Sequence, residues 1–269
     1  MEVDMRRRSF LAGLTVLPAL PLVAHAAKSD LNIGIYPGTG KADILTDDFR
    51  AYAMPFAQAL GASVGAKPKL TLFRSIRSVM GSLKSGRLDL YFVPPTVAVA
   101  VLDNDYTPVA RVRDQATGVL VRRKGAAVEA VALTEKESWL DVMARDTLRR
   151  NKIGVQKIYN FKEQDDVVLA MQRGYAQAGS LRSKKADELI AKDGFELWHP
   201  LPTTPDFTLM ASNRLSAAEQ DRLGTAAVAL SPEAIQSLQK TIHSKVTGFV
   251  IDKQADYRTI KQAISEAGY

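Results

Sequence analysis

Short apolar segments alternate with longer segments of helical periodicity from residue 31 onward, and this alternation constrains the fold more than any other feature. Residues 31–36 (LNIGIY) alternate between apolar and small or polar side chains, as a half-buried strand does, and a Pro-Gly pair ends the run. Residues 76–83 instead repeat apolar side chains at i, i+3, i+4 and i+7, which is typical of one face of a helix. Repetition of such pairs predicts an α/β fold with mainly parallel sheet.

The same two patterns assign the remaining elements. Further strands are predicted at residues 69–73, 88–93, 152–156 and 195–198. Helices are predicted at 51–60, 97–102, 139–143, 160–171 and 183–192, with three more between 216 and 269. Side chains that can cap a helix N-terminus mark several of these starts: Ser75, Thr96, Thr134 with Glu137, Asn160 with Glu163, Ser216 with Glu219, and Ser231 before Pro232.

Two segments are extended without belonging to a strand–helix pair. Residues 107–123 are rich in valine and arginine, and residues 207–212 form a second extended stretch. Such segments suit two crossings between two lobes of one chain.

The first 26 residues have the three-part order of a secretory signal peptide. A basic cluster at Arg6–Arg8 precedes an apolar run, and Ala24-His25-Ala26 supplies a small-x-small cleavage site. The apolar run holds about 15 residues against the roughly 20 that span a bilayer, so a membrane anchor is disfavoured. Residues 7–11 (RRSFL) resemble the twin-arginine export motif, which implies folding before export; ordinary Sec export is the alternative. We therefore expect the mature protein in the periplasm.

Composition narrows the classes of function. The chain contains no cysteine, which excludes disulfides, thiolate metal sites, a cysteine nucleophile and a lipid-anchored lipoprotein. Its formal charge is +7, and removal of residues 1–26 takes away three arginines and two acids. The charge left, about +6, suits nucleic acid, a membrane surface or small anions. Export argues against nucleic acid, and the basic residues are scattered as on a solvated surface.

Five short motifs follow one another along the chain in an order that resembles a known family. They are Asn32–Pro37 (NIGIYP), Ser85–Leu90 (SGRLDL) leading to Pro94-Pro95, Pro108–Arg111 (PVAR), Gln172–Ala176 (QRGYA) and Asp256-Tyr257. Their order resembles the phosphate/phosphite/phosphonate substrate-binding proteins of ABC transporters. The resemblance spans residues 31–269 and is strongest over 31–111.

The resemblance implies a type II periplasmic binding protein fold, in which two α/β lobes joined by two crossing strands close around a solute and present it to a membrane permease. It divides the chain into a signal peptide (1–26), lobe 1 (28–112 plus 210–269) and lobe 2 (113–209). We expect a monomer that binds a small anionic solute and partners an ABC permease. No cofactor, metal or nucleic acid is expected.

Candidate ligand-binding residues follow from a general rule for open α/β sheets. Ligands lie beyond the carboxyl ends of the strands, where helix N-termini offer unpaired N–H groups and partial positive charge. In lobe 1 the rule selects Tyr36, Thr39, Arg74, Ser75, Pro95 and Thr96. In lobe 2 it selects Lys157, Tyr159, Asn160, Ser180 and Arg182, with Arg113 and Thr204 on the hinge side.

Each candidate also has a purely structural interpretation. Ser75, Thr96 and Asn160 can be helix caps alone, or caps that also bind ligand. Arg74 and Arg182 can be solvated or ion-paired surface residues, and the two tyrosines can pack within their own lobes.

One segment departs from the family pattern. Phosphonate binders typically carry a Ser/Thr-rich turn at the start of the second-lobe helix, whereas residues 158–163 of this chain read IYNFKE. The aromatic and amide side chains of this segment favour a different organic anion, such as a carboxylate.

An enzyme is the main rival class, but the sequence lacks a convincing catalytic set. His25 leaves with the signal peptide, and His199 and His243 are isolated. The adjacent pairs Asp47-Asp48 and Asp165-Asp166 would point about 100° apart on a helix, so they cannot act together as an acid/base pair. The glycines of residues 34–40 do not match a P-loop or a dinucleotide-binding pattern. We predict no catalytic residues.

A sensor is the second rival, in which the same pair of lobes reports a ligand to a membrane kinase or to another periplasmic complex. Its fold would be identical, so the sequence leaves transport and sensing open.

Overall fold

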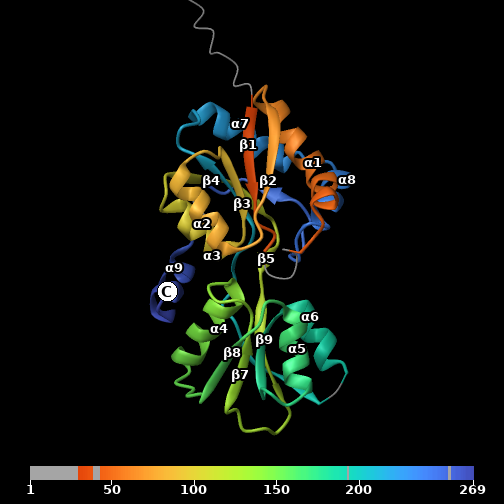
Figure 1. Cartoon of the computed structure of the whole chain (residues 1–269), viewed down its shortest axis with the longest axis vertical. Helices are drawn as coiled ribbons and strands as arrows, with labels where there is room; N and C mark the ends of the chain where they lie inside the picture. Colours follow the sequence, from red (N-terminus) through yellow and green to blue (C-terminus); the bar gives the residue numbers. More distant parts are fainter. Residues whose placement is uncertain (1–29, 39–42, 193, 254–255) are drawn as a thin grey trace, which may run out of the picture.

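The computed structural model describes residues 30–38, 43–192, 194–253 and 256–269 and shows two lobes, one above the other in Figure 1. The predicted signal peptide and Thr39 lie outside these residues. Each lobe is built around its own β-sheet, and a third, two-stranded sheet lies between them. None of the described helices is both long and apolar enough to cross a membrane.

Lobe 1 contains a six-stranded sheet in the order β13-β4-β12-β3-β1-β2. Its strands are β1 (Asp30–Ile35), β2 (Lys67–Leu72), β3 (Leu90–Val93), β4 (Tyr106–Val112), β12 (Thr208–Ser212) and β13 (Phe249–Val250). β1 runs parallel to β2 and β3, while β12 runs antiparallel to β3 and β4.

Helices cover both faces of the lobe 1 sheet. They are α1 (Thr46–Ser63), α2 (Ile76–Ser85), α3 (Pro95–Leu102), α7 (Ala217–Val228) and α8 (Pro232–Gln239). Two apolar clusters result, one under α1, α7 and α8 and one under α2 and α3. A ring cluster of Phe56, Phe92 and Phe249 joins α1 to the sheet, with ring centroids 5.3 to 5.8 Å apart. This double-sided burial explains why the central strand β3 (LYFV) is a continuous, fully buried apolar run.

Lobe 2 repeats the same plan with a five-stranded sheet in the order β10-β6-β9-β7-β8. Its strands are β6 (Gly118–Arg123), β7 (Ala130–Leu133), β8 (Lys157–Asn160), β9 (Ala178–Arg182) and β10 (Phe195–Pro200). One face packs against α4 (Trp139–Arg150), and the other packs against α5 (Gln164–Gln172) and α6 (Ser183–Ile190).

The two lobes are joined by a pair of short antiparallel strands. β5 (Gln115–Ala116) pairs with β11 (Thr204–Pro205), at the place where both predicted crossings pass between the sheets. Trp139 at the start of α4 donates its indole N–H to the Thr204 hydroxyl over 2.8 Å, so lobe 2 is tied to this hinge.

The C-terminal helix α9 (Arg258–Ala267) lies beside both lobes (Figure 1). Ile260 belongs to the apolar cluster of lobe 1, whereas Ala263 belongs to that of lobe 2. Lys261 pairs with Asp103 of lobe 1, and Glu266 pairs with Arg149 of lobe 2. The helix therefore bridges the lobes, whereas the sequence-based division placed it in lobe 1 alone.

The structure corrects the expectation of mainly parallel sheet. The crossing segments supply β4, β6 and β12, and these strands pair antiparallel to their neighbours, as β10 does to β6. A strand that enters a sheet from the crossing runs in the direction opposite to the strands already there. Each sheet therefore contains both parallel and antiparallel pairs.

Local helix signals gave mixed results. The capping boxes of Ser75 and Ser216 and the cap of Ser231 are confirmed. The start predicted at Thr134 is wrong, because Ser138 is the N-cap of α4 and Glu137 adopts φ 67°. The strand predicted at 152–156 lies at Lys157–Asn160, so Asn160 ends a strand and does not cap α5, whose N-cap is Glu163. Pro94, and not Thr96, is the N-cap of α3.

Candidate functional site

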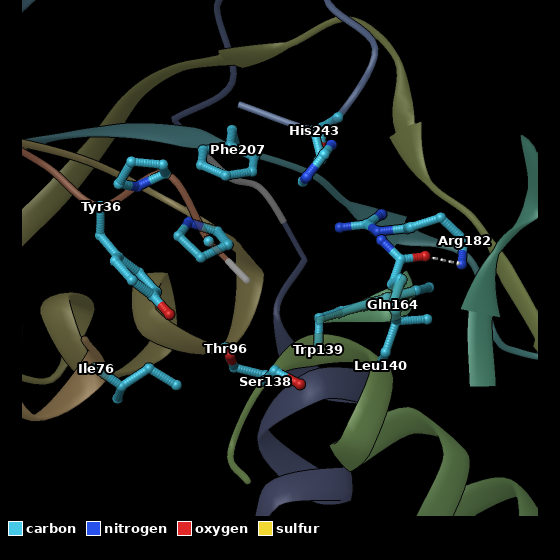
Figure 2. A pocket seen from close by; sticks show the side chains of 14 residues that line it. Tyr36, Ile76, Thr96, Ser138, Trp139, Leu140, Gln164, Arg182, Phe207 and His243 are labelled. Atoms are coloured by element: carbon cyan, nitrogen blue, oxygen red, sulfur yellow. Dashed lines mark hydrogen bonds between the residues drawn. The ribbon is translucent and has the colours of Figure 1, made fainter. Parts of the chain in front are cut away.

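A cavity of about 40 Å³ lies between the lobes, beside the hinge (Figure 2). Both lobes and the hinge segment supply its walls. This position agrees with the general rule that ligands lie beyond the carboxyl ends of the strands, where the helices begin. The lining residues are Tyr36, Pro37, Gly38, Ile76, Pro94, Thr96, Ser138, Trp139, Leu140, Gln164, Arg182, Phe207, His243 and Ser244.

The first turn of α3 forms the lobe 1 wall. The helix follows directly from β3, because Pro94 is extended with ψ 167° and Pro95 occupies the first helical position, where proline is favoured. The amides of Thr96 and the next residue have no acceptor within the helix, as in any first turn. The Thr96 hydroxyl is buried and lacks a hydrogen-bond partner among the described residues. A buried hydroxyl without a partner is costly, and Thr96 is the one such residue that also lines this cavity among the described residues.

The first turn of α4 forms the facing wall from lobe 2. Ser138 caps it by accepting a hydrogen bond from the Asp141 amide over 3.4 Å, and its hydroxyl lies 2.7 Å from the Thr134 hydroxyl. Trp139 and Leu140, the first two helical residues, reach the cavity (Figure 2). Two helix N-termini from opposite lobes therefore meet at one small cavity, where both partial charges favour an anion.

Arg182 is the arginine of the cavity wall. It ends β9, and its guanidinium stacks 4.4 Å from the Trp139 ring centroid. The guanidinium also pairs with the buried Asp206 at 3.3 Å, and the Arg182 amide donates to Gln164 over 2.8 Å. These contacts fix the arginine in place, but Asp206 balances its charge. The site can thus orient an anion without holding a large net positive charge.

Two contacts cross from lobe 1 to lobe 2 near the cavity. The Tyr36 hydroxyl donates to Glu135 over 3.3 Å, and Lys162 lies 2.7 Å from Asp43. Burial raises the pKa of the Glu135 carboxyl, and the Tyr36 hydrogen bond and Lys162 oppose that rise. Burial, followed by the neighbouring Glu135, raises the pKa of Tyr36, so the phenol keeps its proton. The lobes are therefore in direct contact in this structure.

Three of the residues selected from the sequence line this cavity, namely Tyr36, Thr96 and Arg182. Other selected residues lie outside its lining, where each has its own contacts. Arg74 donates to the Ile44 carbonyl and the Thr46 hydroxyl, and Ser75 caps α2. Pro95 is buried behind Pro94, while Arg113, Lys157 and Tyr159 are exposed.

Asn160 is also absent from the lining, because its amide is used within lobe 2. It donates to the Thr134 carbonyl over 2.6 Å and to Asp141 over 2.8 Å. Ser180 is buried within β9, and Thr204 accepts the Trp139 hydrogen bond at the hinge. The inference of a carboxylate ligand rested on residues 158–163, and none of these lines the cavity; lobe 2 reaches it through the start of α4, through Gln164 at the start of α5 and through Arg182.

Several lining residues were missed from the sequence. Ser138 carried a usable signal, because Ser138 and Asp141 are spaced like a cap and its third helical residue. Gln164 follows the predicted cap of α5 and could have been included with it. Phe207, His243 and Ser244 carried no local signal, since they reach the cavity from loops that only the tertiary fold brings there. Among the described residues, no cluster of three His, Asp or Glu side chains could hold a metal ion.

Comparison with known proteins gives a family and a fold. Residues 45–257 match the family model described as ABC transporter, phosphonate, periplasmic substrate-binding protein. No curated protein matches the sequence.

Solved structures share the architecture at low sequence identity. PhnD1 from Prochlorococcus marinus, in complex with methylphosphonate, aligns with a TM-score of 0.67 and 15% identity over 89% of this chain and 98% of its own. XAC2383 from Xanthomonas citri, bound to ATP, gives 0.68 and 15% over 89% and 96%. The aliphatic sulphonate binding protein SsuA from Escherichia coli gives 0.57 and 14% over 89% and 91%. These likenesses confirm the predicted two-lobed fold.

Proposed function

Because the chain belongs to the phosphonate-type periplasmic substrate-binding proteins of ABC transporters, we propose that it captures a small anion in the cavity between its lobes and delivers it to an ABC permease. The observation that carries the proposal is the meeting of two helix N-termini at this cavity, with the partnerless Thr96 hydroxyl between them. A fixed array of N–H and O–H donors binds an anion without needing a formal charge in contact with it.

The size of the cavity supports a compact anionic head. A volume of about 40 Å³ holds a group of few heavy atoms and is too small for a nucleotide. The related structures include proteins named for phosphonate and sulphonate ligands, and tetrahedral heads of this kind present several acceptors to surrounding donors. We therefore place phosphonates and sulphonates ahead of carboxylates as ligands.

Ligand entry requires the lobes to separate and close again. The short β5–β11 pair is the natural place for bending, because a few residues in a two-stranded connection can absorb the change in backbone angles. The Tyr36–Glu135 and Asp43–Lys162 contacts form across the lobes and would help hold the closed state. In this proposal lobe 1 (28–112 plus 210–269) and lobe 2 (113–209) move as the two bodies, and α9 moves with lobe 1, so its contacts with α4 change when the lobes separate.

A thermal-shift screen tests the proposal directly. The mature protein is heated with methylphosphonate, phosphate, methanesulphonate or acetate, and with a neutral sugar as a control. A bound anion should raise Tm progressively with its concentration, since ligand that binds only the native state stabilises it. Stabilisation by the neutral compound, with none by any anion, would contradict the anion site.

Thr96→Val provides the site-specific test. Valine keeps the shape and removes the hydroxyl, so anion affinity should fall about 10- to 100-fold by calorimetry, as expected when a hydrogen bond to a charged group is lost. Thr96→Ser should keep most of the affinity, and Thr225→Val on the exposed face of α7 should change nothing. Unaltered affinity in Thr96→Val would remove the α3 start from the site.

We also propose that the protein is exported to the periplasm as a folded monomer. Replacing Arg7 and Arg8 together by lysine should leave the precursor in the cytoplasm if the twin-arginine route is used. Normal periplasmic appearance of this variant in cell fractions would instead indicate the Sec route.

A further inference from the structure

A second cavity of about 260 Å³ adjoins the anion site on the side of α9. It lies between α2 and α3 of lobe 1, α4 of lobe 2 and the C-terminal helix. Its walls are formed by Ile76, Met80, Thr96, Val97, Val99, Ala100, Asp103, Glu137, Val142, Ile264 and Tyr269. Most of these side chains are apolar, and Val97, Val99 and Val142 are buried.

The two cavities share a wall. Ile76 and Thr96 line both of them, so the partnerless Thr96 hydroxyl lies at the boundary between the polar site and the apolar space. The anion site itself offers only about 40 Å³. A ligand whose head occupies that space has an apolar volume next to it, beyond Ile76 and Thr96, toward which its remaining atoms can extend.

The charges on the wall restrict what can enter. Asp103 is paired with Lys261 at 2.8 Å, and Tyr269 donates its hydroxyl to Asp141 of α4. Both charged residues of the wall, Asp103 and Glu137, are acidic, so a second anionic group would be repelled. An apolar group instead finds a mainly hydrocarbon surface, and an apolar cavity of about 150 Å³ is already large enough for a benzene ring.

We propose that the physiological ligand is an amphiphilic anion whose uncharged hydrocarbon substituent occupies the cavity lined by α2, α3, α4 and α9. This inference rests on the proposed function, because the head must bind between the helix N-termini. It makes the C-terminal helix part of the ligand-binding wall, through Ile264 and Tyr269.

A homologous ligand series tests the proposal. Calorimetry is used to compare methylphosphonate, propylphosphonate and hexylphosphonate on the mature protein. Each methylene removed from water strengthens binding roughly fourfold at most. Because the chain must also be ordered, hexylphosphonate should bind about 100-fold more tightly than methylphosphonate.

Ala100→Phe fills the apolar cavity from α3 without touching the lining of the anion site. The gain from methyl to hexyl should drop below about fivefold, because the substituent loses its space, while methylphosphonate affinity stays within about twofold. The exposed Ala51→Phe variant on α1 should retain the full gain. If Ala100→Phe does not fold, Ala100→Leu should give a smaller loss in the same direction.

Four results would overturn the inference. Methylphosphonate binding without any gain from a longer chain would leave the anion site intact and remove the apolar subsite. A full gain in folded Ala100→Phe would place the substituent elsewhere. Tighter binding of 3-aminopropylphosphonate than of propylphosphonate would show that the acidic wall recognises a cation. If no member of the series binds, the anion site fails as well, and both proposals fall together.

Discussion

The starts of α3 and α4 face each other across the same cavity, yet their polar side chains are used differently. At α3 the buried Thr96 hydroxyl has no partner among the described residues. At α4 the Ser138 hydroxyl is bonded to both Thr134 and the Asp141 amide. In the proposed function the unpaired hydroxyl at the start of α3 is free to bind the anion, whereas the bonded hydroxyl at the start of α4 stabilises the fold.

The contacts of Asp141 explain why the polar side chains at the start of α4 stabilise the fold. Its carboxylate is fully buried and accepts hydrogen bonds from Arg145, Asn160 and Tyr269. It thereby joins α4 to β8 and to the C-terminal helix. Substitutions at α4 should therefore reduce stability, while substitutions at Thr96 should reduce affinity. Four substitutions test this difference.

Asp141→Ala should have the largest effect. Removing the carboxylate leaves Arg145 and the Asn160 amide without their buried acceptor, so the free energy of unfolding should fall by about 3 kcal/mol in urea denaturation. Asp165→Ala is the control, because Asp165 is exposed and its pair with Lys185 is worth less than about 1 kcal/mol. Equal losses in the two variants would refute the structural role of Asp141.

Ser138→Ala should lower stability by about 1.5 kcal/mol, because it removes a helix cap and the partner of the buried Thr134 hydroxyl. Ser231→Ala removes only the cap of α8 and should lower stability by about 1 kcal/mol. Anion affinity should change less in Ser138→Ala than in Thr96→Val. A larger loss of affinity at Ser138 would reverse the contrast between the two helix starts.

Tyr269→Phe should cost about 1 kcal/mol, because it removes one of several donors to the buried Asp141 carboxylate. The half-exposed position of Tyr269 and the remaining donors keep the loss small. Tyr175→Phe, at an exposed tyrosine of lobe 2, is the matched control and should leave the urea midpoint unchanged. No difference between the two variants would mean that α9 is not held to lobe 2 by this contact.

Glu135→Gln should have the smallest effect, visible as a change in pH dependence. The pKa of Glu135 is raised in the folded protein by burial, so the folded state retains this proton to higher pH than the unfolded state does. Wild-type stability should thus decline as pH rises from the ordinary glutamate pKa of 4.5 through the raised folded value.

Glutamine cannot lose a proton and can still accept from Tyr36, so the variant should gain stability relative to wild type between pH 4 and pH 8. Urea midpoints at these two pH values measure this difference. A gain of the same size at both values would show that the carboxyl titrates normally.

Local sequence was a good guide wherever neighbouring residues decide the structure. The caps at Ser75, Ser216 and Ser231 were predicted correctly because the donor amide lies three residues away. The caps at Thr134 and Asn160 were wrong for a long-range reason. Asn160 pairs with Leu133 in the sheet and uses its amide on the Thr134 carbonyl and Asp141, and these contacts outweigh a cap.

The site was predicted in part for the same reason. Tyr36, Thr96 and Arg182 lie at strand ends or helix starts, so a rule that depends on element order could place them at the cavity. Phe207 and His243 come from connecting segments, so the order of strands and helices does not predict that they line the cavity. The departure from the family pattern lies at residues 158–163, which are outside the cavity lining, whereas lobe 2 lines the cavity with the start of α4, Gln164 and Arg182.

The sequence by itself determined the alternation of strands and helices, the two crossings and the family, because each depends on local periodicity or on the order of short motifs. Tertiary structure decided which helix starts face each other, which hydroxyls are already bonded and where α9 packs. These depend on contacts between residues far apart in the chain, such as Asp141 and Tyr269, which are 128 positions apart, and no local pattern encodes them. The packing of that last helix also brings Ile264 and Tyr269 into the wall of the apolar cavity.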